Sequence, residues 1–100
     1  MSIAMDAWVY VVVQNPGGDE RIAGQHDETH GVAFIPAFME KDPAQQGLLQ
    51  MVREKGVRYE VQAILFEDLL RYAAGGPYCV FILDDAGRIT ERYSPAGQKF

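Results

Sequence analysis

Trp8-Val9-Tyr10-Val11-Val12-Val13 is the stretch that decides the fold. All six residues are β-branched or aromatic, so they favour a strand, and apolar side chains occupy both of its alternating faces. The turn-forming run Asn15-Pro16-Gly17-Gly18 follows directly and ends the strand. The pattern predicts a central strand that is buried on both sides.

Further strands are predicted on the C-terminal side of this one. Val32–Ile35 is a second apolar run, and Pro36 places its end at an edge or a bulge. Residues 58–63 alternate polar with apolar side chains, which indicates a strand with one solvated face. Residues 78–93 contain two strand-like runs around Asp84-Asp85-Ala86-Gly87, a loop whose length and final glycine are typical of a hairpin.

Two segments carry the signals of helices. Asp42 suits an N-cap and Gly56 a stop, so we expect a helix over Pro43–Lys55. Apolar side chains then recur at helical spacing over residues 65–74, which predicts a second helix. Each helix has one apolar stripe that needs a sheet to pack against.

The chain of 100 residues is long enough for one domain, and its 48% hydrophobic and 23% charged side chains are ordinary for a globular protein. We expect an α+β fold in which a mixed sheet of about five strands carries both helices on one face. Residues 1–93 are expected to form this domain and residues 94–100 a flexible C-terminal tail. So short a chain buries roughly 60–65% of its unfolded surface, which is compatible with a homodimer whose partner subunit covers more of it.

Composition excludes several classes of function. Nine basic residues against 14 acidic ones give a net charge of −5, so we expect no binding to the phosphates of nucleic acid. The aliphatic hydroxyls are few, which argues against a serine hydrolase. They are Ser2, Thr29, Thr90 and Ser94.

The cellular compartment is predicted from one cysteine and one short apolar run. Cys79 cannot form an internal disulfide and suits a reducing environment. Residues 7–13 are far too few to span a bilayer, and no basic segment precedes them as in a signal peptide. We therefore expect a cytoplasmic protein with no membrane partner.

The middle of the chain resembles a known family. Over residues 31–83, a strand ending in Phe34-Ile35-Pro36-Ala37-Phe38 is followed by a helix, a short strand, a helix containing Asp68-Leu69-Leu70, and the apolar strand Cys79–Leu83. This order is similar to the N-terminal domain of the SseB family. That family tends to place Asn-Pro-Gly after the last strand, where this chain has Asp84-Asp85-Ala86-Gly87. The resemblance implies a regulatory or interaction module and transfers no catalytic residue.

One cluster has side chains that bind metals. In a strand, His26, Glu28 and His30 would point to one side as a two-histidine, one-carboxylate set for a divalent metal. Their order fits neither H-E-x-x-H nor H-x-x-E-H. Because Gly24 and Gly31 flank the cluster, a solvated polar loop without a cofactor is the favoured interpretation. A metal-binding protein or metal-dependent enzyme is therefore the alternative function.

The favoured function, protein binding, rests on an apolar segment in the negatively charged first half of the chain. Phe34, Pro36, Phe38, Met39 and Glu40 are the candidate protein-binding residues, because apolar side chains at a strand end can form a contact surface. All five net negative charges come from residues 1–50. The sequence thus favours a small cytosolic binding or regulatory module that acts through protein–protein contacts or self-association.

Overall fold

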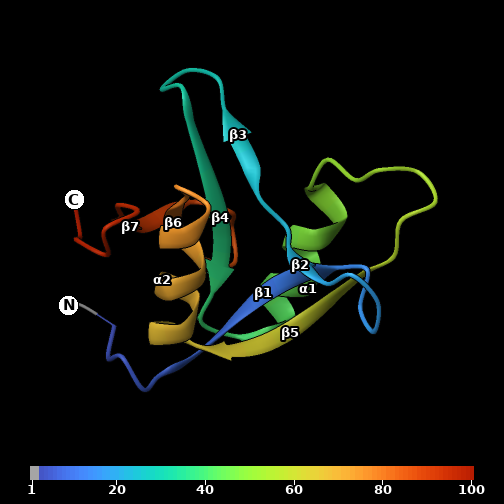
Figure 1. The fold of residues 1–100 in the computed structure, drawn as a ribbon, viewed down its shortest axis with the longest axis horizontal. Helices are drawn as coiled ribbons and strands as arrows, with labels where there is room; N and C mark the ends of the chain where they lie inside the picture. The colour runs from blue at the N-terminus through green and yellow to red at the C-terminus, as the bar shows by residue number, and fades with distance from the viewer. Residues whose placement is uncertain (1–2) are drawn as a thin grey trace.

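The computed structural model describes residues 3–100, which form a mixed sheet with two helices (Figure 1). The elements, in chain order, are β1 (Trp8–Gln14), β2 (Arg21–Ile22), β3 (Gln25–Asp27), β4 (Val32–Phe38), α1 (Lys41–Gln50), β5 (Tyr59–Leu65), α2 (Phe66–Gly75), β6 (Cys79–Leu83) and β7 (Ile89–Tyr93). The predicted α+β class, mixed sheet and single domain are confirmed. The sheet has seven strands rather than about five.

The predicted central strand is β1, and its neighbours explain the two extra strands. On one side β1 pairs along its whole length with antiparallel β5. On the other side it meets β4 only at Tyr10 and Phe38, and the two strands then diverge. β2 pairs with the end of β1 and β3 with the start of β4, so residues 21–27 bridge the gap. β6 lies parallel to β4, and β7 closes the hairpin with β6.

The two helices cover opposite faces of this sheet (Figure 1), so the prediction that both lie on one face is wrong. Alternate residues of each strand point to opposite sides, and β1 is apolar on both. The α2 side holds the larger core: Val9, Val11, Val13, Ile35, Ala37, Phe66, Leu69, Ala73, Val80, Ile82 and Tyr93. The α1 side buries Val12, Ala23, Phe38, Ala44 and Val61.

The second helix has nearly its predicted bounds, whereas α1 ends at Gln50 rather than at Lys55. Met51 already has extended backbone, with ψ of 151°. The side-chain amide of Gln25 contacts the backbone of the next residue, Val52, just beyond this end. It accepts from Val52 N–H at 3.4 Å and donates to Val52 C=O at 3.5 Å.

The C-terminal hairpin matches its prediction. Asp84 Oδ1 accepts from the backbone N–H groups of Ala86 and Arg88, both at 2.9 Å, and Gly87 has a φ of 79° that favours glycine. Residues 94–100 turn back along β7, where Phe100 N–H donates to Arg92 C=O at 2.9 Å. The flexibility of this tail stays a prediction.

Candidate functional site

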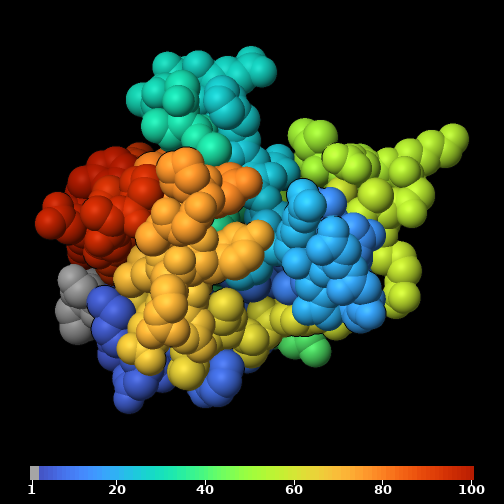
Figure 2. All heavy atoms as spheres, in the orientation of Figure 1, coloured from blue at the N-terminus to red at the C-terminus, as the bar shows by residue number. Residues whose placement is uncertain are grey.

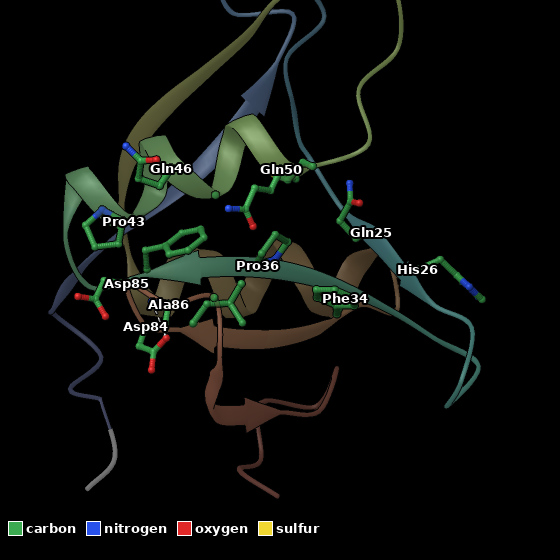
Figure 3. A pocket seen from close by; sticks show the side chains of 15 residues that line it. Gln25, His26, Phe34, Pro36, Pro43, Gln46, Gln50, Asp84, Asp85 and Ala86 are labelled. Atoms are coloured by element: carbon green, nitrogen blue, oxygen red, sulfur yellow. Dashed lines mark hydrogen bonds between the residues drawn. The ribbon is translucent and has the colours of Figure 1, made fainter.

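A groove of about 400 Å³ lies between α1 and the parallel strands β4 and β6 (Figure 3). Its floor is one face of β4, formed by Phe34, Pro36 and Phe38. One flank of α1 forms the opposite wall. The β6–β7 loop closes one end and β3 the other. We call this feature the α1 groove.

The floor follows from the period of a strand, since Phe34, Pro36 and Phe38 are alternate residues and share a side. The ring of Phe34 is held by stacking on Phe81, with the ring centroids 4.5 Å apart. Pro36 lies where β4 changes partner from β3 to β1, which suits a residue without an N–H. The floor is therefore apolar and held in place by the sheet.

The α1 wall is set by one close contact. Gly47 lies against the ring of Phe38, and a Cβ there would overlap that ring. Phe38 is only 2% exposed, and Ala44 is the one α1 residue that is fully buried. The helix thus rests on the Phe38 end of the floor and leaves the Phe34 end open.

Two glutamines give the α1 wall its polarity. Gln46 and Gln50 are four residues apart and both line the groove, and Figure 3 shows Gln50 reaching from α1 toward β4. Both are exposed. Within residues 3–100 neither amide has a hydrogen-bond partner. Each brings a donor and an acceptor to the groove that the fold does not use.

The two ends of the groove differ in charge. Asp84 and Asp85 lie at the β6–β7 end, and His26 lies at the β3 end (Figure 3). The Asp84 carboxylate already accepts two backbone hydrogen bonds within the β6–β7 turn. Asp85 is exposed and has no partner within the described part of the chain. The carboxylates that line the groove therefore lie at its β6–β7 end.

The predicted protein-binding residues divide into two groups. Phe34, Pro36 and Phe38 line the α1 groove, whereas Met39 and Glu40 are exposed at the entry to α1. Pro36 and Phe38 are buried by the fold, so they cannot form an open rim. A ligand reaches them only through the groove.

The predicted metal ligands His26, Glu28 and His30 are not brought together. His30 Nδ1 lies 2.8 Å from Asp27 Oδ2, and Asp27 Oδ1 accepts the N–H of Thr29 at 3.0 Å and of His30 at 3.2 Å. The hydrogen bond from His30 lowers the pKa of Asp27. No three histidine, cysteine or acidic side chains within residues 3–100 could hold a metal ion. The cluster forms a polar hairpin turn that projects from the body of the molecule (Figure 2).

Sequence reasoning missed Gln46, Gln50 and Asp85 as groove residues. The glutamines look like an ordinary solvated helix face, and Asp85 like an ordinary turn residue. The available signal was spacing, because Pro43, Gly47 and Gln50 recur at intervals of four and three residues, which places them on one helix flank. That flank has neither charge nor bulk, unlike the exposed face of α2.

No family model, curated protein or solved structure matches this chain. The resemblance to the SseB family therefore stays a prediction. No helix in the described residues is both long enough and apolar enough to cross a membrane.

Proposed function

We propose that this protein is a binding module whose α1 groove accepts a short, extended, apolar segment of a partner protein. The observation that carries the proposal is the apolar floor of Phe34, Pro36 and Phe38 beneath a helix flank with two uncommitted amides. Pro36 and Phe38 are buried by the fold, so the open part of this floor is its Phe34 end.

The size of the α1 groove supports a short ligand. Because α1 covers Phe38, the accessible floor runs from Phe34 to Pro36, two strand steps or about 7 Å, which is the length of about two extended residues. The volume of about 400 Å³ lies in the range of small-ligand pockets. A long helix or a folded domain would not enter a groove of this size.

The chemistry of the walls supports a peptide. Alternate apolar side chains of an extended segment would contact the β4 floor, because the floor itself has a two-residue period. The amides of Gln46 and Gln50 can each donate to a peptide carbonyl and accept from a peptide N–H. Both kinds of contact come from residues held by regular secondary structure.

The charge of the groove sets the direction of the segment. Asp85 is free at one end, and the whole chain carries a net charge of −5. An arginine or lysine of the ligand is therefore favoured at the β6–β7 end. A ligand with an acidic residue there would meet like charge.

The test uses fluorescein-labelled short peptides with alternate leucines, ending in either arginine or glutamate, in a polarisation assay. The arginine peptides should bind, and more tightly than the glutamate peptides. Gln50→Trp fills the groove and should weaken binding at least about tenfold. The control Gln45→Trp, on a solvated part of α1 that does not line the groove, should change it by less than about twofold. Absence of binding, or equal effects of the two variants, would refute the proposal.

A further inference from the structure

Besides the α1 groove, the outer edge of β5 is a second candidate contact surface. β5 pairs with β1 over seven consecutive residues on its inner side, without a bulge. Among residues 3–100 no strand pairs with its other side, and β5 forms the border of the sheet in Figure 1. A strand edge of this length can pair with another strand.

Two hydrogen bonds identify the backbone groups on this edge. Asn15 N–H donates to Arg58 C=O, and Phe66 N–H donates to Ala7 C=O, both at 2.9 Å. In antiparallel pairs the hydrogen-bonded positions alternate, so the even-numbered residues of β5 bond to β1. The N–H and C=O groups of the odd-numbered residues point outward. They are Tyr59, Val61, Ala63 and Leu65.

This edge lacks the features that usually protect one. β5 contains no proline and no lysine, and Glu60 is its single charged residue. Ala63 is exposed and has a small side chain, and it is one of the two central residues among the four whose backbone groups point outward. The edge is open to close approach by another backbone.

We propose that the β5 edge pairs with β5 of a second copy of this chain, antiparallel, about a two-fold axis at Gln62. In this register Val61 lies opposite the partner's Ala63, and Tyr59 opposite the partner's Leu65. All four outward-facing residues then exchange both backbone hydrogen bonds. The strand is thus its own complement, as a two-fold interface requires.

The charges agree with this register. Glu60 lies opposite the partner's Ile64, and Gln62 opposite itself, so no like charges face each other across the pair. Elsewhere two copies with a net charge of −5 each repel. The segment 58–65 is neutral, since Arg58 balances Glu60. It is therefore a favourable place for two copies to meet.

Trp8 supplies a second, independent reason for a partner here. It is 59% exposed although it is the largest apolar side chain in the molecule, and it pairs with Leu65 of β5. Trp8 and Leu65 therefore lie side by side on one face of the sheet. If the two β5 edges paired, the partner's Tyr59 would lie on the other side of Leu65, on the same face. Dimerisation would then bury part of the Trp8 ring.

The experiment measures mass by sedimentation, and the emission of Trp8, over a series of protein concentrations. Trp8 is the single tryptophan, so its emission reports this interface alone. The wild type should form a dimer, and its emission should shift to shorter wavelength as the dimer forms. Ala63→Lys should raise the dissociation constant at least about tenfold and abolish the shift. That variant makes the chain less negative, so reduced general repulsion cannot explain a loss of dimer.

Two further variants complete the test. Ala86→Lys adds the same charge on the exposed β6–β7 turn and should leave the dimer unchanged. Ala63→Pro removes one outward N–H and no bond to β1, so it should also give a monomer. A wild type that stays monomeric throughout, or a dimer that Ala63→Lys does not weaken, overturns the proposal. Equal weakening by Ala86→Lys overturns it as well. The peptide assay of the α1 groove is separate from these readouts.

Discussion

The two helices cover the two faces of the sheet to different extents. On one face α2 buries Phe66, Leu69 and Ala73, and its side chains join a continuous core with β1, β4 and β6. On the other face α1 buries only Ala44 and stands beside an open groove. The difference shows that α2 packs more closely on its face of the sheet than α1 does on the other.

The cause lies in the helix sequences. In α2 the apolar residues Phe66, Leu69, Leu70 and Ala73 recur at i, i+3, i+4 and i+7 and make a broad stripe. In α1 the flank toward β4 has glutamines and Gly47 instead of apolar side chains. A helix of this composition can cover only part of a sheet face.

The largest expected effect is a difference in the free energy of unfolding between leucine substitutions on the two faces of the sheet. Leu69→Ala on α2 removes a side chain that is fully buried and should lower the free energy of unfolding by about 2–5 kcal/mol. Leu48→Ala on α1 removes a half-buried side chain and should cost about 1 kcal/mol. Urea unfolding of both variants measures the difference. Equal losses would mean that the α1 face is packed as tightly as the α2 face.

A pair of glycine substitutions should give effects of opposite sign. Alanine at Gly47 gains about 1 kcal/mol of helix propensity but must displace the ring of Phe38, which costs about 1–3 kcal/mol. Gly47→Ala should therefore lower the free energy of unfolding by about 1 kcal/mol. Gly75→Ala at the end of α2 meets no neighbour and should raise it by about 0.5–1 kcal/mol. Thermal or urea unfolding checks both signs, and a stabilising Gly47→Ala would show that α1 does not rest on Phe38.

The reactivity of Cys79 tests whether the sheet beneath the groove is as well closed as the core. Cys79 is buried, and burial raises the pKa of its thiol. The raised pKa favours the protonated form in the folded protein, so the free energy of unfolding should decrease as pH rises through the ordinary thiol range. The native thiol should react at least about tenfold more slowly with a disulfide reagent than the thiol of the urea-unfolded chain. Equal rates would show that the β6 strand opens readily.

The smallest effect is expected in the β3–β4 hairpin, away from both helices. The hydrogen bond from His30 lowers the pKa of Asp27, so its stabilisation is present above the ordinary carboxyl pKa and is lost as pH falls through the lowered value. In NMR titrations, His30→Ala should return the Asp27 midpoint toward its ordinary value while unfolding changes little. His30 is exposed to screening solvent, which keeps the contribution of the pair small. An unchanged midpoint would mean that the pair does not form in solution.

The fold was predictable where a single strand or helix carries its own period. The run from Trp8 to Val13 has apolar side chains on both faces, and the structure covers both. That same pattern already required a helix on each side, which is why the one-face arrangement is wrong. β2 and β3 were not predictable, because strands of two or three residues show no period and pair only where β1 and β4 diverge.

Only part of the candidate site, the β4 floor, was predictable from the sequence. The alternation of Phe34, Pro36 and Phe38 places them on one side of a strand, and the structure agrees. Just beyond the end of α1, Val52 makes a tertiary contact with Gln25, which is distant in sequence. The role of Gln46 and Gln50 depends in turn on where α1 lies over β4. Neither fact is contained in local spacing.

The most direct test of the binding role is an amide NMR titration with the arginine-ending leucine peptide. We predict that shifts concentrate at Phe34, Gly47, Gln50 and Asp85, which line the α1 groove. The amide signals of buried α2 residues, such as Leu69 and Ala73, should not move. Shifts confined to α2 or to the β5 edge, or no shifts at saturating peptide, would contradict the assignment of the α1 groove as the binding site.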